Sequence, residues 1–237
     1  MANGTANIAL LIDADNASPA GIDSVLTVLA ELGSVNIRRA YGNWKKPALK
    51  GWEALVQRHA IMPQQQFDVS KGKNATDMRM TIDAMDLLYS GRIGGFGIMS
   101  SDSDFGPIAM RLKQDGLPVY GFGSDKTPES FREACTRFIL IDQLPPMADA
   151  TGPAAKAAPA KRPIDAELVA LLTDAYTASK RDAKGFASLS EIGNVAGNRS
   201  SFDARNYGFQ RLSDLMEKVD NFAVERRENG VFVRRVR

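Results

Sequence analysis

Two short apolar runs, residues 8–12 and 96–99, limit the possible folds of this chain more than any other feature. Neither run alternates polar with apolar side chains, as a strand with one face in water would. Continuous apolar strands of this kind belong to parallel sheets whose two faces are both covered by helices. Up to Asp142 such runs alternate with segments of helical period, which predicts an α/β domain with a doubly wound, mainly parallel sheet.

The same periodicities predict the elements of this domain. We expect strands near residues 8–12, 35–41, 66–69, 96–100, 117–121 and 138–141. We expect helices near residues 19–32, 48–59, 75–89, 105–114 and 128–134. In the helix over 75–89, four apolar side chains recur at helical spacing and should face the core: Met78, Ile82, Met85 and Tyr89.

A linker is predicted over residues 143–163, where prolines lie among many alanines. This composition has too little apolar bulk for a core and too much proline for a helix. It separates a domain over residues 1–142 from a second, smaller one over residues 164–237.

The second domain has the pattern of a small winged helix-turn-helix. Amphipathic segments predict helices over residues 165–179, 189–196 and 203–219. Strands are predicted over 222–226 and 231–235, and the Asn-Gly pair between them is a strong hairpin signal.

The composition excludes several classes of protein. The single cysteine, Cys135, excludes an internal disulfide, and the single histidine, His59, excludes most zinc sites built from Cys and His. No apolar run approaches the roughly 20 residues needed to cross a membrane, and the start lacks the features of a signal peptide. We therefore expect a cytoplasmic protein. Residues 149–237 carry 15 Lys and Arg against 12 Asp and Glu, which suits a polyanionic partner, although surface solubility explains this excess equally well.

Acidic side chains follow both apolar runs. Asp13 and Asp15 follow the first run, Asp102 and Asp104 follow the second, and Asp77 lies in the first turn of the helix over 75–89. The carboxyl ends of strands are where open α/β sheets form their sites. Two unit charges about 4 Å apart repel by roughly 4 kcal/mol at an effective dielectric of about 20, so such a cluster requires a cation or shared protons.

Helix capping is the alternative for each acid taken singly. Asn74 and Asp77 resemble a capping box, Asp102 and Asp104 precede a predicted helix, and Asp15 with Asn16 suits an Asx turn. Capping gives no reason for acids to gather at the ends of two strands and one helix, so we favour a site. Asp83, six residues after Asp77, lies on another face of the helix and is at most an outer candidate.

Tyr41, Trp44, Lys45 and Lys46 follow the second predicted strand and suit single-stranded nucleic acid. Aromatic rings stack on unpaired bases for ~1–3 kcal/mol each, and lysines neutralise phosphate. The alternative is a loop whose tryptophan covers the core. Two further lysines just before Asp77 are either phosphate contacts or solvated loop charges: Lys71 and Lys73.

These motifs together resemble the NYN domain of the LabA-like group, over roughly residues 6–142. The matching segments are Ile12-Asp13-Ala14-Asp15-Asn16, Tyr41-Gly42-Asn43-Trp44, Lys73-Asn74-Ala75-Thr76-Asp77, Ile82-Asp83-Ala84-Met85-Asp86 and Ser100-Ser101-Asp102-Ser103-Asp104-Phe105. The resemblance implies a PIN-like sheet in which the first and fourth strands are neighbours. It also implies the ligands of one or two Mg²⁺ or Mn²⁺ ions, which are Asp13, Asp77, Asp102 and Asp104, with Asp15 and Asn16 supporting them.

Residues from about 164 to 237 resemble the LOTUS domain, also called OST-HTH. The segments that match are 189–193 and 207–216. The resemblance implies RNA binding and, in some members, protein partners. On the predicted helix over 203–219, four side chains are candidates for RNA contacts: Arg205, Asn206, Gln210 and Arg211.

We therefore expect a metal-dependent ribonuclease that hydrolyses phosphodiester bonds in RNA, with a second domain that recruits the RNA. The chief alternative is a non-catalytic RNA-binding adaptor, and another is a helix-turn-helix regulator that binds DNA. The number of metal ions, the choice between endo- and exonuclease action, a homodimer and a protein partner for the second domain all stay open at this point.

Overall fold

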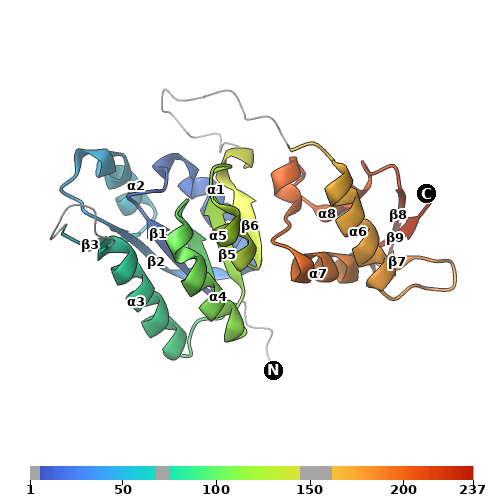
Figure 1. Ribbon diagram of the computed structural model, residues 1–237, viewed down its shortest axis with the longest axis horizontal. Coiled ribbons are helices and arrows are strands. Elements are labelled where there is room, and N and C mark those ends of the chain that lie inside the picture. The colour runs from blue at the N-terminus through green and yellow to red at the C-terminus, as the bar shows by residue number, and fades with distance from the viewer. Residues whose placement is uncertain (1–5, 68–74, 145–161, 237) are drawn as a thin grey trace. The chain divides into compact units, whose positions relative to one another are not determined.

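The computed structural model of this chain describes residues 6–67, 75–144 and 162–236 (Figure 1). It divides into two compact units, residues 1–154 and residues 155–237. Most of the predicted linker over 143–163 lies outside the described residues.

The first unit is built on a six-stranded sheet in the order β3-β2-β1-β4-β5-β6, and every neighbouring pair is parallel. The α/β prediction is therefore confirmed. The strands are β1 (Asn7–Asp13), β2 (Ser34–Gly42), β3 (Met62–Gln65), β4 (Gly95–Met99), β5 (Val119–Gly123) and β6 (Arg137–Leu140).

The chain winds in two directions from the centre of this sheet. From β1 it runs outward through β2 to β3, and from β4 it runs outward through β5 to β6. The first and fourth strands are neighbours, with Ile12 of β1 opposite Met99 of β4. The point between them is a topological switch point, where ligands bind in open α/β sheets.

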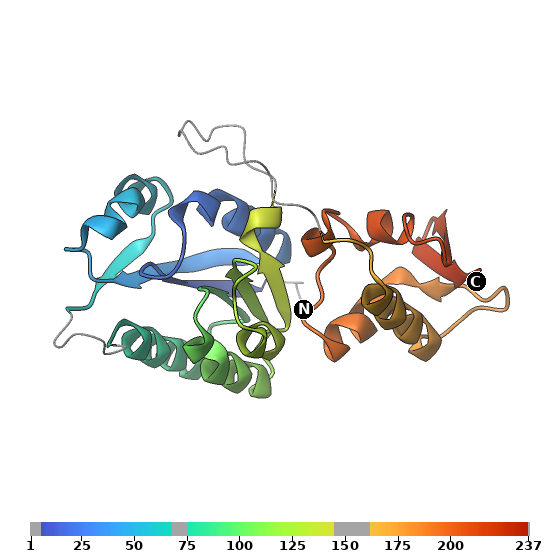
Figure 2. The same ribbon diagram turned by 45° about the horizontal axis from the view of Figure 1, so that its top comes forward.

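Helices cover both faces of the sheet (Figure 2). One face packs against α1 (Ile22–Leu32) and the 3₁₀ segment η2 (Pro47–Trp52) through side chains such as Leu29 and Trp52. The other face packs against α3 (Ala75–Tyr89), α4 (Gly106–Gln114) and α5 (Glu129–Ala134). The remaining helical segments are η1 (Pro19–Gly21), α2 (Glu53–Arg58), η3 (Ser103–Phe105) and η4 (Ile141–Gln143).

Two predicted helices begin instead as 3₁₀ turns at a proline. Residues 19–32 divide into η1 and α1, and residues 48–59 divide into η2 and α2. Proline has no N–H and a fixed φ, so it suits the first turn, where the N–H lacks a partner in any case.

The strand predicted over 66–69 is wrong, because β3 spans Met62–Gln65. This strand lies at the edge of the sheet, next to β2, and most of its side chains are exposed. An edge strand tolerates Pro63, and it lacks the apolar run by which the central strands could be predicted.

The predicted core-facing stripe of α3 is also wrong. Met78, Ile82 and Tyr89 are 65%, 49% and 73% exposed, and only Met85 packs against the core. The side chains that α3 buries are Thr76, Met80, Asp83, Ala84 and Leu87. The core-facing stripe therefore includes a carboxylate and a small residue, and the more apolar stripe faces outward.

The described residues of the second unit form three α-helices, one 3₁₀ segment and a three-stranded sheet in the order β7-β9-β8. Its core is formed by buried side chains that include Leu172, Ile192 and Val233. The elements are α6 (Ala166–Ala178), β7 (Ala187–Ser188), α7 (Leu189–Arg199), η5 (Ala204–Tyr207), α8 (Leu212–Met216), β8 (Phe222–Arg227) and β9 (Gly230–Arg235).

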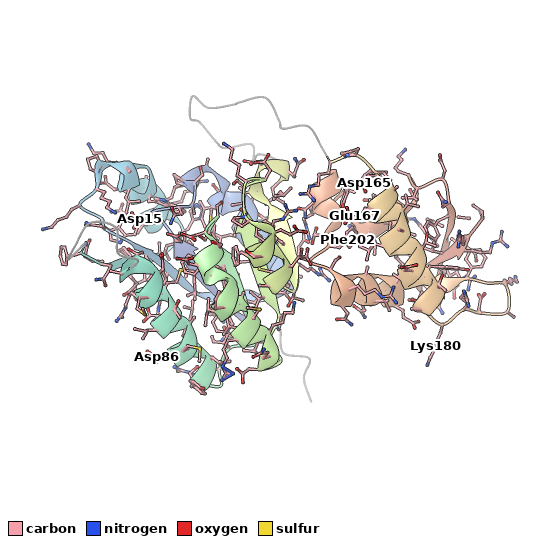
Figure 3. All side chains as sticks on the ribbon, in the orientation of Figure 1. Asp15, Asp86, Asp165, Glu167, Lys180 and Phe202 are labelled. Carbon is pink, nitrogen blue, oxygen red and sulfur yellow. The ribbon has the colours of Figure 1, made fainter. Side chains whose placement is uncertain are left out.

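The N-terminus of α6 is capped by Asp165, whose side chain accepts a hydrogen bond of 2.9 Å from the backbone N–H of Leu168 (Figure 3). The hairpin of β8 and β9 is confirmed, and Gly230 after Asn229 has a φ of 134°. The continuous helix predicted over 203–219 is wrong. Gly208 has a φ of 81° in the left-handed region and ends η5, so only the short helix α8 follows.

No helix among the described residues has both the length and the apolar character that a membrane span requires. Cys135 is buried without a disulfide, as predicted, and burial raises the pKa of its thiol to about 12.

Candidate metal centre

Three predicted site residues come together at the switch point. Asp77, Asp102 and Asp104 each offer a carboxylate oxygen, and these three oxygens lie within 4.8 Å of one another. Asp77 comes from the first turn of α3, whereas Asp102 and Asp104 follow β4. Residues far apart in the sequence thus form one acidic group because α3 begins beside the carboxyl end of β4.

Asp13 is the last residue of β1 and is completely buried. Its Oδ2 accepts hydrogen bonds of 2.6 Å from Ser100 Oγ and 2.9 Å from Asn16 Nδ2. Its Oδ1 is buried and has no hydrogen-bond partner in the part of the chain that the structure describes. A buried polar atom without a hydrogen-bond partner lowers the stability of the fold by roughly 1–3 kcal/mol. A bound cation would give this oxygen a partner.

Burial also shifts the titration of Asp13. Desolvation raises the pKa of its carboxyl above the ordinary value, and the hydrogen bonds from Ser100 and Asn16 oppose this shift only in part. A buried carboxylate held at the end of a strand is unstable without a compensating positive charge.

The electrostatics of Asp77 show that four neighbouring acids act on its carboxyl group. Desolvation is the largest cause that raises its pKa to about 6, and the charge of Asp13 comes next. The charges of Asp102, Asp104 and Asp15 raise it further, in that order. Asp13 and Asp15 therefore belong to the same negative field as the three clustered acids, and a bound divalent cation would relieve the repulsion.

The capping alternative holds for Asp102 without excluding a site. Its Oδ1 accepts a hydrogen bond of 2.9 Å from the backbone N–H of Asp104 and so caps η3. One oxygen of the carboxylate thus fixes the side chain. For Asp77 the predicted capping partner, Asn74, lies outside the described residues.

The two supporting candidates differ in their contacts. Asn16 orients Asp13 through the hydrogen bond to Oδ2. Asp15, labelled in Figure 3, forms an ion pair of 3.3 Å with Lys46 and accepts a hydrogen bond of 3.2 Å from Thr76 Oγ1. Asp15 therefore links the loop after β2 to the start of α3.

Asp83 is not an outer ligand of this centre. Its Oδ2 accepts hydrogen bonds of 3.0 Å from Tyr41 Oη and 3.0 Å from Arg39 Nη1, and its Oδ1 pairs with Arg79 at 3.2 Å. The carboxylate is buried and fully engaged, so its role is to fasten α3 to β2.

The predicted base-stacking role of Tyr41 is therefore wrong. Its ring is fully buried in the core and its hydroxyl donates to Asp83. Desolvation and the charge of Asp83 raise the pKa of this hydroxyl beyond its usual range. A ring enclosed in this way cannot stack on a base.

Trp44 serves mainly to cover the core, which was the alternative for this loop. Its half-buried ring packs against the core, and its indole Nε1 donates a hydrogen bond of 3.1 Å to the carbonyl of Gln64. Lys45 lies with its Nζ 5.0 Å from the ring centroid of Phe67, which is 53% exposed. Lys71 and Lys73 lie outside the described residues.

In the second unit two of the four candidate RNA contacts are not available. Asn206 is buried, and Arg205 pairs with Asp203 at 3.0 Å with 14% of its side chain exposed. Both lie in the 3₁₀ turn that replaces the predicted long helix. Gln210 and Arg211 are exposed and remain candidates.

Two exposed arginines on this unit, Arg181 and Arg234, were not among the predicted RNA contacts. The guanidinium of Arg234 lies 5.1 Å from the ring centroid of Phe186, and that of Arg181 lies 5.4 Å from the ring centroid of Tyr176. Arg227 lies over Phe186 as well, but Asp182 and Glu225 neutralise it. The sequence could have indicated Arg234, because successive side chains of a strand point to opposite faces and its neighbour Val233 is apolar and buried.

Comparison with protein families agrees with this geometry. Residues 7–142, more than half of the chain, match the family model of the NYN domain. This chain belongs to the NYN domain family. In addition, residues 161–234 match the model of the OST-HTH/LOTUS domain. The NYN domain is a nuclease-type domain and the OST-HTH domain is an RNA-binding one, so the predicted resemblances are confirmed for both.

One curated relative is an uncharacterised protein of Methanocaldococcus jannaschii. It is 29% identical over 126 residues, which are 52% of this chain and 49% of that protein. The NYN protein described here thus spans about half the length of this relative.

Two solved structures are more distant. A protein of unknown function from Vibrio parahaemolyticus has 16% identity and a TM-score of 0.48, covering 60% of this chain and 96% of its own. A carbohydrate transporter from Acidothermus cellulolyticus, in complex with myo-inositol, has 9% identity and a TM-score of 0.30, covering 83% and 52%. Neither likeness is close enough to bear on function.

Proposed function

We propose that this NYN protein is a metal-dependent ribonuclease that hydrolyses phosphodiester bonds in single-stranded RNA. The observation that supports this most is the buried Oδ1 of Asp13, which has no partner among the described residues and belongs to the same acidic field as Asp77, Asp102 and Asp104. The all-oxygen character of this group fits Mg²⁺ or Mn²⁺.

The residues of the proposed centre have two different roles, metal binding and the positioning of Asp13. Asp13 Oδ1 and the carboxylates of Asp77, Asp102 and Asp104 would hold the cation. Ser100 and Asn16 fix the position of Asp13, since they bind its other oxygen. A divalent cation, when bound, neutralises charge on the phosphate and lowers the pKa of water. Repulsion from the neighbouring acids and desolvation raise the pKa of Asp77 to about 6, and a bound cation would lower this pKa and keep the carboxylate ionised as a ligand.

Cleavage of a labelled single-stranded RNA in Mn²⁺ tests this proposal. We expect the wild-type protein to cleave, and Asp13→Asn and Asp102→Asn to lose at least a hundredfold in rate. Glu53→Gln, which changes an exposed acid on α2, should cleave as the wild type does. Equal cleavage by Asp13→Asn and the wild type would refute the assignment. Binding of RNA without turnover in any metal would favour the non-catalytic adaptor.

For the OST-HTH domain we propose that Arg181 and Arg234 contact RNA phosphates. Both guanidinium groups lie over aromatic rings that hold them in place, at 5.4 Å from Tyr176 and 5.1 Å from Phe186. Both arginines are exposed at the surface of the same domain. Stacking on a ring leaves the N–H groups of arginine able to bind an anion.

RNA affinity in the inactive Asp102→Asn background measures this contribution without cleavage. We expect Arg181→Ala and Arg234→Ala each to weaken binding severalfold and to lower the salt dependence by about one phosphate contact. Arg199→Ala is the control, because that exposed arginine lies on α7 and pairs with Asp174 at 3.7 Å. Unchanged affinity in both test variants would assign recruitment to another surface.

A further inference from the structure

The outer face of α3 exposes an apolar stripe that the nuclease centre does not use. Four side chains recur along one side of this helix: Met78, Ile82, Met85 and Tyr89. We call them the α3 stripe. Three of them are 65%, 49% and 73% exposed, whereas Met85 is half-buried and also packs against the core. Single exposed apolar side chains are ordinary, but a row of them on one helix face marks an interaction surface.

The described part of the second unit has no comparable row of exposed apolar side chains. Among its described residues Val236 is the large hydrophobic side chain that is exposed, at 49%. In the first unit the other exposed large hydrophobic residues are Met62, Phe67 and Met110. At one end of the α3 stripe, Arg111 of α4 donates a hydrogen bond of 3.0 Å from its Nη2 to Tyr89 Oη.

The spacing of the α3 stripe is self-complementary. Met78 and Tyr89 lie equally far from the midpoint between Asp83 and Ala84, and so do Ile82 and Met85. If a second α3 lies antiparallel across this midpoint, Met78 meets Tyr89 of the other copy and Ile82 meets Met85. Every member of the stripe then has an apolar partner.

The charges beside the stripe fit the same arrangement. Arg79 and Asp86 lie on one flank of the stripe, about 100° and 80° around the helix from Met78 by 3.6-residue geometry. A twofold axis between antiparallel helices brings the same flank of each helix together, so Arg79 of one copy approaches Asp86 of the other. The midpoint between Arg79 and Asp86 lies between Ile82 and Asp83. It is one residue, or about 1.5 Å along the helix axis, from the midpoint of the α3 stripe. Asp86 is exposed on the outer side of α3, as Figure 3 shows.

We propose that a second copy of this chain covers the α3 stripe and forms an antiparallel, twofold dimer through α3. The dimer places an opposite charge beside each Arg79 and Asp86. Since a C₂ interface is self-complementary, a palindromic stripe is the pattern it requires. One helix face is smaller than the ~800 Å² per partner of a stable complex, so the dimer is weak and reversible.

Analytical ultracentrifugation over a range of protein concentrations measures the association. We expect dimer formation by the wild type and at least tenfold weaker association by Ile82→Glu, which places two charges at the twofold axis. Met62→Glu is the matched control, because Met62 is 58% exposed on the edge strand β3 and is not part of α3. A wild-type protein that stays monomeric at every concentration would overturn the proposal, as would equal association by Ile82→Glu.

Disulfide formation tests the antiparallel register independently of any loss of stability in Ile82→Glu. In the proposed dimer, a mixture of Met78→Cys and Tyr89→Cys cross-links, whereas either variant alone does not. Two copies of the same position are about 16 Å apart along the helix axis, beyond the reach of a disulfide. The native Cys135 is buried and should not compete. Cross-linking by each variant alone would indicate a parallel pair and contradict the register.

These outcomes do not depend on the nuclease. A protein that dimerises without cleaving RNA would leave the dimer in place and refute the proposed activity. A monomer that cleaves RNA in Mn²⁺ would do the reverse. Protection of the stripe from solvent in a monomeric protein would indicate that another part of the same chain covers it, and would also refute the dimer.

Discussion

Replacement of Asp77 by Asn should stabilise the metal-free protein, because the native carboxylate lies in an unfavourable field. Desolvation and then the charges of Asp13, Asp102, Asp104 and Asp15 raise its pKa from 3.8 to about 6. This shift corresponds to at most about 3 kcal/mol of lost stability once the group is ionised. Asp77 is only half-buried, so solvent screening reduces the expected effect to about 1 kcal/mol.

The pH dependence of this effect has a definite sign. Near pH 3 the carboxyl is largely protonated in both the folded and the unfolded chain, because this pH lies below both pKa values, and the variant gains almost nothing. Between pH 3.8 and about 6 the unfolded chain ionises first, so the folded wild type loses stability as the pH rises. The free energy of unfolding of Asp77→Asn should therefore exceed that of the wild type by about 1 kcal/mol at pH 7.5 and by nearly nothing at about pH 3.

Chemical denaturation in EDTA at the two pH values measures the difference, and thermal unfolding should show a rise of roughly 3 °C at pH 7.5. Addition of Mn²⁺ should reverse the order. A ligand at 100 times its Kd stabilises the wild type by about 2.7 kcal/mol, and Asp77→Asn should gain much less. Glu53→Gln is the control and should follow the wild type at both pH values. An Asp77→Asn variant that is less stable than the wild type in EDTA at pH 7.5 would refute the reasoning.

Three further variants test the structural assignments. Asp83→Ala should lower the free energy of unfolding by about 3 kcal/mol, because it leaves Arg39 and Tyr41 without their buried partner. RNA cleavage per folded molecule should be unchanged. A loss of cleavage by the fully folded variant would show that Asp83 belongs to the metal centre. Asp165→Ala should cost about 1 kcal/mol in the unfolding of the second unit, since it removes the N-cap of α6, and no change in denaturation midpoint would contradict that cap. Gly208→Ala should destabilise the same unit by about 1 kcal/mol because of its φ of 81°, and an equally stable variant would show that the turn is not strained.

The sheet could be predicted from the sequence because its central strands are continuously apolar. β1 and β4 are almost wholly buried, and their periodicity is distinct from that of the helices. β3 could not be placed in the same way, since an edge strand buries few side chains. Periodicity alone gave no strand order, and the adjacency of β1 and β4 came from the family resemblance.

The acidic centre was predictable for a related reason, because carboxylates at the ends of parallel strands share one edge of the sheet. Asp102 and Asp104 were located by their position after β4. What sequence could not show is how each oxygen is used. The hydrogen bonds from Ser100 and Asn16 that leave Asp13 Oδ1 as the unpartnered oxygen depend on side-chain geometry.

The wrong predictions for α3 and Tyr41 came from the assumption that apolar side chains are buried and polar side chains are exposed. On α3 the regular stripe of Met78, Ile82 and Tyr89 faces outward, whereas the buried face includes Asp83, which hydrogen bonds keep in the core. A helical wheel cannot show that a carboxylate has buried partners on another strand. Tyr41 was misassigned for the same reason, since its partner is Asp83.

Anomalous diffraction from crystals soaked in Mn²⁺ tests the central claim most directly. We expect a manganese peak at the carboxyl end of β1 and β4, bound by Asp13 Oδ1 together with carboxylate oxygens of Asp77, Asp102 and Asp104, and lost in Asp13→Asn crystals. A protein that cleaves RNA while its manganese binds elsewhere, or binds equally well in Asp13→Asn, would contradict it.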